Sequence, residues 1–279
     1  MSRELGDIMK RITSLVAGVL ASVLAVPTFA LADPATPPSR ASVPTYVALG
    51  DSLATGVGAS DRAETAYVPL FHEYLRENLS CGRGDSQVCP SLRLNNVGVS
   101  GATSTSLLQV QMPQALAELQ ARNQDATSRN DVAVITVDIG GNDVFPLVAV
   151  CAGGFTADCQ LGIQQRFTTF IQNFTLTLNQ LRAAAGPDTE IVVMTYYNSL
   201  VGCNLAALSS LGDVVLEGAP GILAMGLNDW IRAIAAGAGA SVAETYGRLG
   251  PADLVGGTDC LHANDSGYRI IADAFAQAI

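Results

Sequence analysis

The chain has 279 residues, of which 49% are hydrophobic and 14% are charged, a balance that excludes intrinsic disorder and favours a folded protein with a large core. Its net charge of −10 disfavours binding to nucleic acid and to anionic lipid headgroups. The only lysine is Lys10, in a segment that we expect to be removed, so the mature chain has no P-loop lysine and no Schiff-base lysine.

Residues 1–32 have the arrangement of a secretory signal peptide. Lys10 and Arg11 precede an apolar run over residues 15–26, and Ala30-Leu31-Ala32 has the small residues of a cleavage site. A transmembrane anchor is the alternative, but the apolar run is shorter than the roughly 20 residues that a spanning helix needs. We therefore predict cleavage after Ala32, a secreted protein and no stable membrane anchor.

The rest of the chain is predicted to form one domain. Residues 33–44 are rich in proline and should be an extended leader, and the domain should cover residues 45–279. Short apolar runs that are typical of buried strands occur at residues 46–49, 92–97, 132–137, 191–194 and 241–243. Helical spacing of apolar residues occurs between them, at residues 67–75 and 163–181, and Gly186 should end the second helix.

This alternation of strands and helices predicts an α/β fold with a mostly parallel sheet of about five strands between two helical layers. In such folds ligands bind beyond the carboxyl ends of the strands, so functional residues should follow the strands directly.

The first strand leads into Gly50-Asp51-Ser52-Leu53. A serine at the end of a parallel strand is well placed to be a nucleophile, although the same residues are also typical of an ordinary turn or helix cap. A serine nucleophile needs a base. The only histidines are His72, in the middle of a predicted helix, and His262.

His262 is the better candidate for the base, because Asp259 lies three residues before it. A carboxylate at that spacing can accept a hydrogen bond from one imidazole nitrogen while the other nitrogen faces the serine. The alternative is that Asp259 and His262 cap the final helix.

Two further glycine-containing segments, at residues 98–101 and 140–143, also follow predicted strands. Acyl transfer needs fixed hydrogen-bond donors where the carbonyl oxygen becomes negative. A backbone N–H at a glycine and the side-chain amide of Asn142 can provide two such donors.

With these four segments the sequence resembles the GDSL family of serine esterases and lipases, also called SGNH hydrolases. The matching blocks lie at residues 48–53, 96–103, 139–143 and 259–262. The resemblance implies a three-layer α/β/α, flavodoxin-like fold. The branch that it is most similar to is that of the secreted actinobacterial lipases and esterases.

The resemblance also implies a role for each matching residue. Ser52 would be the nucleophile, His262 the general base and Asp259 the carboxylate that orients it, although some members of the family use a backbone carbonyl instead. The oxyanion would bind the backbone N–H groups of Ser52 and Gly101 and the side chain of Asn142.

We therefore predict a monomeric, secreted esterase or lipase that hydrolyses lipid-like or short aliphatic esters without a cofactor. The alternatives are a carbohydrate acetyl esterase, a phospholipase and a secreted binding module without turnover. The apolar stretch over residues 200–227 should bury the acyl chain, unless it is a helix pair that only packs in the core. A metal site is not expected, since the chain has two histidines and no Cys-x-x-Cys.

Six cysteines in an exported chain predict three disulfides. Two pairs, Cys81 with Cys89 and Cys151 with Cys159, are eight residues apart and would close local loops. The remaining pair, Cys203 with Cys260, would join two segments at the carboxyl end of the sheet and anchor the loop that holds Asp259 and His262.

Overall fold

The computed structural model describes residues 43–80, 89–124 and 131–279. The predicted signal peptide, most of the leader and Cys81 lie outside these ranges, and so does the expected pair of Cys81 with Cys89.

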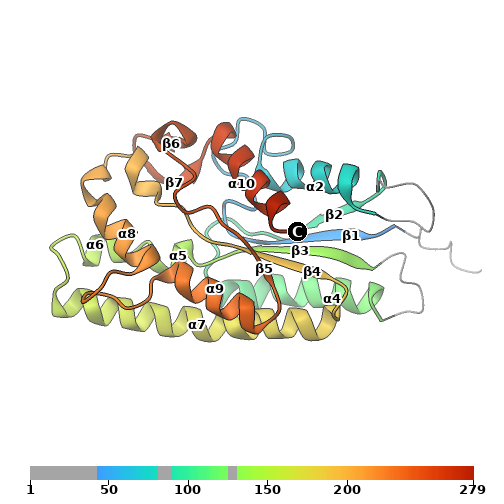
Figure 1. The fold of residues 1–279 in the computed structure, drawn as a ribbon, viewed down its shortest axis with the longest axis horizontal. Helices are drawn as coiled ribbons and strands as arrows, with labels where there is room; N and C mark the ends of the chain where they lie inside the picture. The colour runs from blue at the N-terminus through green and yellow to red at the C-terminus, as the bar shows by residue number, and fades with distance from the viewer. Residues whose placement is uncertain (1–42, 81–88, 125–130) are drawn as a thin grey trace, which may run out of the picture. The chain divides into compact units, whose positions relative to one another are not determined.

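A five-stranded parallel sheet forms the centre of the described residues (Figure 1). Its strands in chain order are β1 (Thr45–Gly50), β2 (Arg93–Asn96), β3 (Val132–Asp138), β4 (Glu190–Met194) and β5 (Ser241–Ala243), and their order across the sheet is β2-β1-β3-β4-β5. Strands β1, β3 and β4 are almost entirely buried, which explains why their sequences are continuous apolar runs. The predicted sheet is confirmed.

Helices cover both faces of this sheet (Figure 1). One layer contains α2 (Tyr67–Asn78) and α10 (Asp265–Gln277), and the other contains α4 (Met112–Arg122), α7 (Ala157–Ala185) and α9 (Leu227–Gly237). Aromatic side chains pack between the two helices of the first layer. The rings of Tyr67 on α2 and Phe275 on α10 are stacked, with their centroids 4.9 Å apart. Helix α7 begins after Thr156, whose side chain caps it, and ends at Gly186 with φ of 79°, as its sequence predicts.

Shorter elements lie around the carboxyl ends of the strands, several of them labelled at the left of Figure 1. They are α3 (Ser104–Ser106), the π-helix η1 (Leu107–Gln111), α5 (Gly141–Val144), α6 (Leu147–Val150), the 3-10 helices η3 (Ser199–Gly202), η4 (Ala206–Leu208) and η5 (Pro251–Asp253), α8 (Ser209–Glu217), and the antiparallel pair β6 (Leu254–Gly256) and β7 (Asp259–Ala263). In the part of the chain that the structure describes, no helix has the length and apolar character needed to cross a membrane.

Candidate active site

The end of strand β1 carries Ser52 into the turn that follows. The buried side chain of Gln111 holds the last residue of the strand, accepting from the N–H of Gly50 at 2.9 Å and donating to its carbonyl at 2.8 Å. A side chain at position 50 would overlap the carboxyl group of Asp138, so only glycine fits. These contacts fix the turn in which Ser52 lies, with 7% of its surface exposed.

His262 and Asp259 both lie on β7, at the spacing that the sequence suggested. Oδ2 of Asp259 is 2.8 Å from Nδ1 of His262, and Oδ1 accepts the backbone N–H groups of Leu261 and His262, each at 3.0 Å. Partial burial raises the pKa of Asp259, but these hydrogen bonds outweigh it and hold the pKa below its ordinary value. Asp259 is therefore ionised at neutral pH and fixes the imidazole ring.

The same ring reaches the serine, because Nε2 of His262 lies 2.9 Å from Oγ of Ser52. The helix that follows is capped by Asn264, whose side chain accepts from Ser266 and Gly267, so the alternative that Asp259 and His262 cap it is wrong. His72 lies elsewhere, with Nε2 2.8 Å from the carbonyl of Leu92.

The three expected oxyanion donors are free to bind a ligand. Among the described residues no acceptor contacts the backbone N–H of Ser52 or of Gly101, and Gly101 has a φ of 80° that favours glycine. The side-chain amide of Asn142 donates one hydrogen to the carbonyl of Ala102 at 2.9 Å, which fixes the orientation of the other. Asn142 and Ser52 line the same pocket.

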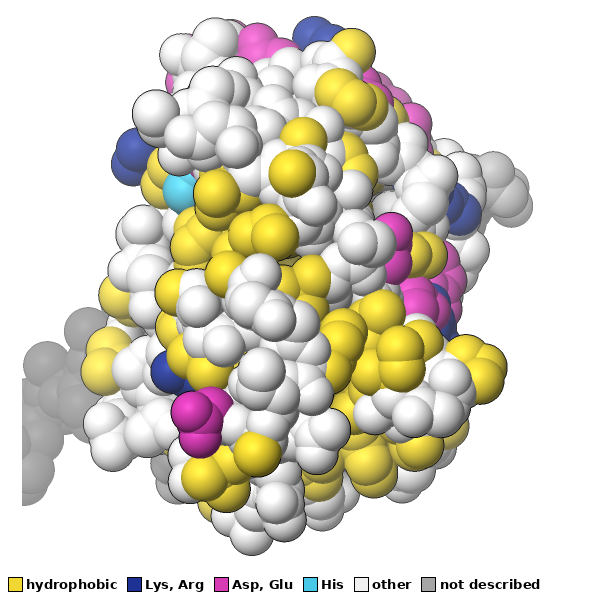
Figure 2. Space-filling model, turned by 90° about the vertical axis from the view of Figure 1, so that its left-hand side faces the viewer, with side chains coloured by type: hydrophobic (Ala, Val, Ile, Leu, Met, Phe, Trp, Pro, Cys, Tyr) yellow, Lys and Arg dark blue, Asp and Glu magenta, His cyan; other side chains and the backbone are white. Residues whose placement is uncertain are grey.

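This pocket has a volume of about 700 Å³, counting the open space at its mouth. Its walls come from α5 and α6 on one side and from η3 and α8 on the other. The apolar lining residues include Leu53, Val144, Phe145, Leu147, Val148, Leu200, Leu211, Val215, Leu216 and Leu261. Figure 2 shows this end of the molecule, where hydrophobic side chains gather over the middle and lower right and charged side chains are few.

The model of the GDSL-like lipase/acylhydrolase family matches residues 48–270, which include all four segments that form the site. The chain belongs to this family. It is thus a hydrolase of the esterase and lipase type. No curated protein matches it.

Solved structures with the same fold include other hydrolases. An extracellular lipase from Streptomyces rimosus is 17% identical, with 85% of this chain and 100% of that chain covered and a TM-score of 0.55. A putative GDSL-like lipase from Parabacteroides merdae is 15% identical, with 84% and 94% covered and a TM-score of 0.56. An acetylxylan esterase from Geobacillus stearothermophilus is 18% identical, with 84% and 93% covered and a TM-score of 0.51. At these identities the likeness shows the fold, and it confirms the expected three-layer architecture.

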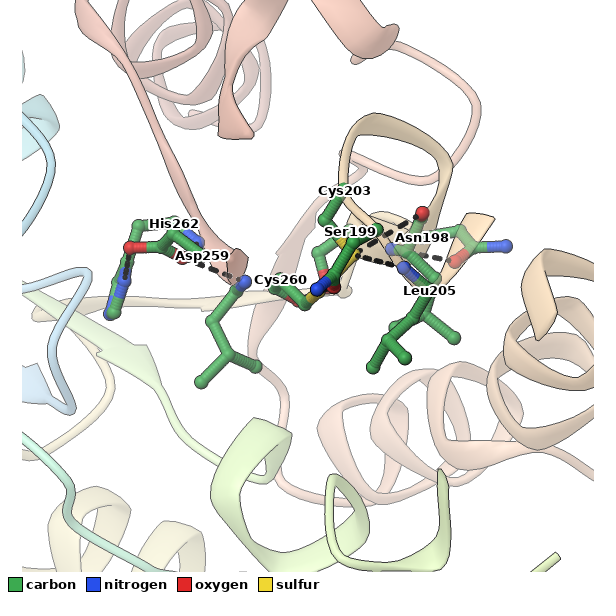
Figure 3. The surroundings of a disulfide bond; sticks show 10 residues. Asn198, Ser199, Cys203, Leu205, Asp259, Cys260 and His262 are labelled. Carbon is green, nitrogen blue, oxygen red and sulfur yellow. Dashed lines mark hydrogen bonds and ion pairs between the residues drawn. A yellow bond between two sulfur atoms is a disulfide. The ribbon is translucent and has the colours of Figure 1, made fainter. Parts of the chain in front are cut away.

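Two disulfides of this GDSL-like hydrolase join the cysteines that the sequence paired. Cys151 is bonded to Cys159, between α6 and α7, and Cys203 is bonded to Cys260. Figure 3 shows the surroundings of the Cys203–Cys260 disulfide. Asp259 and His262 lie on one side of it, and the segment after β4 lies on the other. Ser199 strengthens this junction, because its hydroxyl donates to the carbonyl of Cys260 at 2.6 Å. The bond thus ties the strand that holds the candidate base to the pocket wall.

Removing this bond with the Cys203→Ser, Cys260→Ser double variant is expected to lower kcat and thermal stability together. The bond spans 57 residues, and chain entropy predicts a loss of about 4 kcal/mol in the free energy of unfolding. Ester hydrolysis and calorimetry provide the measurements. The Cys151→Ser, Cys159→Ser double variant is the control, with an expected loss of about 2.5 kcal/mol and an unchanged kcat on a short ester. Unchanged kcat in the first variant would contradict the anchoring role.

Sequence reasoning missed several contacts that shape the site of this hydrolase. Gln111 holds the end of β1 and was not singled out. Tyr196 belongs to the Tyr196-Tyr197-Asn198 segment that resembles the secreted branch of the family, but its hydrogen bond to Asp51 at 2.9 Å was not expected. Asn228 bonds both backbone groups of Tyr196, accepting at 2.7 Å and donating at 2.8 Å. Each lies far along the chain from its partner. Within the described residues no group of three or more His, Cys, Asp or Glu side chains could hold a metal ion.

Proposed function

We propose that the chain is a secreted serine esterase or lipase that hydrolyses lipid-like or short aliphatic esters through an acyl-Ser52 intermediate. One observation carries the proposal: the continuous hydrogen-bonded series from Asp259 through His262 to Ser52, at the edge of an apolar pocket. A carboxylate, an imidazole and a hydroxyl bonded in this order are the groups that activate a serine hydroxyl at neutral pH.

In the first step His262 takes the proton of Ser52 as Oγ attacks the ester carbonyl. Asp259 accepts from Nδ1–H, so Nε2 is the unprotonated nitrogen that faces Oγ, and the carboxylate stabilises the imidazolium that forms. The negative oxygen of the tetrahedral intermediate binds the N–H groups of Ser52 and Gly101 and the free amide hydrogen of Asn142.

The imidazolium of His262 then gives its proton to the departing alcohol oxygen, and the acyl group remains on Ser52. A water molecule enters, His262 removes one of its protons, and the resulting attack on the acyl carbonyl forms a second tetrahedral intermediate. When this intermediate collapses, Oγ of Ser52 takes the proton back from His262 and the carboxylic acid leaves.

The pocket walls support an aliphatic acyl group as the substrate. Leu200, Leu211 and Leu216 come from the stretch that was expected to bury the acyl chain, and Val144 and Leu147 face them from α5 and α6. Each methylene buried against such walls stabilises the bound ester by about 0.8 kcal/mol. An acetyl group would leave most of this apolar surface unused.

The substitution Val148→Phe is expected to shorten the acyl chains that the enzyme accepts. Val148 lines the pocket, so a larger ring there should lower kcat/KM for long acyl esters by about tenfold or more and change it little for acetate esters. The matched control is Val150→Phe, because Val150 lies on the same short helix α6, is 45% exposed and does not line the pocket. Equal losses on long and short esters in Val148→Phe would refute the assignment of the acyl pocket.

A substrate profile tests the proposed substrate class. The wild-type protein should hydrolyse simple aliphatic esters or a triglyceride emulsion with a higher kcat/KM than an acetylated xylan fragment. Faster turnover of the acetylated sugar would identify a carbohydrate acetyl esterase, and preference for a phospholipid would identify a phospholipase. Either outcome would overturn the proposed class.

We also propose that residues 1–32 are removed on secretion and that residues 45–279 are the single catalytic domain after the leader at 33–44. The disulfides of the described residues support an oxidising compartment. N-terminal sequencing of secreted protein should start at Asp33, and a retained Lys10 would contradict the signal peptide.

A further inference from the structure

Two carboxyl groups lie buried beneath the candidate nucleophile. Asp138 ends β3 and has no exposed surface, while Asp51 directly follows β1 and is 2% exposed. Strands β1 and β3 are neighbours, and Gly50 pairs with Asp138, so the register places the two aspartates side by side at the end of the sheet. The two carboxyl groups are close enough for the charge on one to affect the pKa of the other.

Among the described residues the hydrogen bonds that these carboxyl groups accept come from neutral donors. Asp51 accepts from the N–H of Leu53 on Oδ1 and from the hydroxyl of Tyr196 on Oδ2, both at 2.9 Å. Asp138 accepts from the hydroxyl of Tyr67 on Oδ1, and from the N–H groups of Asp51 and Ala54 on Oδ2, both at 3.3 Å. Among the described residues neither carboxyl group forms an ion pair with arginine or lysine.

Electrostatics does not allow both groups to ionise. Two adjacent negative charges in a buried site without a cation repel each other strongly. Burial raises the pKa of both aspartates, and the charge of Asp51 raises the pKa of Asp138 further. Hydrogen bonds lower the pKa of both groups again, and the charge of nearby His262 lowers that of Asp51. The pair therefore holds one proton. Asp138 is fully buried, and Asp51 is the group whose charge interacts with His262.

We propose that Asp51 and Asp138 hold one proton between them, with Asp138 neutral and Asp51 charged, and that the Asp51 carboxylate is a positioning residue which favours the imidazolium of His262. Asp51 is the neighbour of Ser52 in the chain and lines the same pocket, and its charge interacts with His262, whereas Asp259 holds His262 from β7. Two negative groups thus lie near the ring that becomes positive when Ser52 attacks. The inference rests on the proposed role of His262 as base.

Titratable groups from every surrounding element face the pair, and apart from the triad they are neutral tyrosines. They are Tyr46 on β1, Tyr67 on α2, Tyr196 and Tyr197 after β4, Tyr268 on α10, and His262 with Asp259 on β7. Burial raises the pKa of each of these five tyrosines, so their hydroxyls stay protonated. Those of Tyr67 and Tyr196 donate to the pair.

Tyr196 contacts both Asp51 and the segment that contains Asn142. Its hydroxyl donates to Asp51, and its ring packs so closely on Gly141 that a Cβ there would lie 2.7 Å from the ring. Gly141 precedes Asn142. A charged Asp51 carboxylate binds the Tyr196 hydroxyl more strongly than a neutral one would, and so helps to keep Tyr196, Gly141 and Asn142 in place.

Infrared spectroscopy of the wild-type protein in neutral buffer tests the shared proton without any substrate. We expect a carbonyl stretching band of a protonated, buried carboxylic acid that is lost in Asp138→Asn and retained in the surface control Asp188→Asn. If Asp138→Asn removes no such band, the shared proton is refuted. This result does not depend on whether the protein hydrolyses esters.

The pH dependence of kcat/KM tests the positioning role. In Asp51→Asn the acid limb, which reports protonation of the base, should move to lower pH by about one unit, and kcat should fall about tenfold. In Asp138→Asn the acid limb should move by less than about 0.3 unit, because a neutral group replaces a neutral group. Equal shifts in both variants, or none in a folded Asp51→Asn, would overturn the assignment. If Asp51→Asn does not fold, the infrared result and the Asp138→Asn profile decide the question.

Discussion

Replacement of Ser52 with alanine should lower kcat/KM for ester hydrolysis by at least about a thousandfold, with the melting temperature almost unchanged. The Oγ atom that is removed is the one 2.9 Å from Nε2 of His262, and the mature chain has no lysine to act as a substitute nucleophile or base. Among the described residues the hydroxyl of Ser52 forms no hydrogen bond other than the one with His262, so calorimetry should show a native protein.

The two histidines provide a matched comparison for this result. His262→Ala should lose activity to the same extent as Ser52→Ala, because the residues act as one unit. His72→Ala should retain most activity, since its ring bonds the carbonyl of Leu92 and lies 6.4 Å from the ring of Tyr46 on the far end of β1. A comparable loss in a folded His72→Ala would contradict the assignment of the base.

Asn142→Ala should lower kcat by about 100-fold to 1,000-fold and leave KM nearly unchanged. One amide hydrogen of Asn142 is bound to the carbonyl of Ala102, and the other is the one that we propose as an oxyanion donor. The interaction strengthens as negative charge develops, so its loss should affect the transition state more than the bound ester.

A second asparagine serves as the control for this variant. Asn173 on α7 donates to the hydroxyls of Ser104 and Thr105 and does not line the pocket, so Asn173→Ala should keep both kinetic constants within about threefold. Steady-state kinetics on one ester separates the two constants. An increase in KM alone for Asn142→Ala would make Asn142 a ground-state binding residue instead of an oxyanion donor.

The sheet could be predicted from the sequence because strands covered on both faces are apolar throughout. The runs before Gly50 and before Ile139 mark β1 and β3 within one or two residues of their observed ends. The order of these runs along the chain does not predict the order of the strands across the sheet, in which β1 lies between β2 and β3. The candidate site was predictable for a related reason, since its residues directly follow strands or lie on one short segment.

Residues that support the site from a distance could not be found in this way. Gln111 lies in an amphipathic helical stretch, and only the folded chain brings its amide to Gly50, 61 residues away. Asp138 interrupts an apolar run and could have been noticed as a polar residue at a strand end, but its partner Asp51 follows another strand. The pocket wall from α5 and α6 was missed because no spacing in the sequence relates residues 144–148 to residues 200–216.

Labelling with a fluorophosphonate tests the central claim, that Ser52 is a serine nucleophile activated by His262, more directly than any rate measurement. The reagent forms a stable bond only with an activated hydroxyl, and mass spectrometry of the digested protein identifies the modified residue. We expect one adduct per chain, on Ser52, that forms with loss of esterase activity and much more slowly in His262→Ala. A folded protein that stays unlabelled, or one that loses activity through an adduct on any other residue, would contradict the claim.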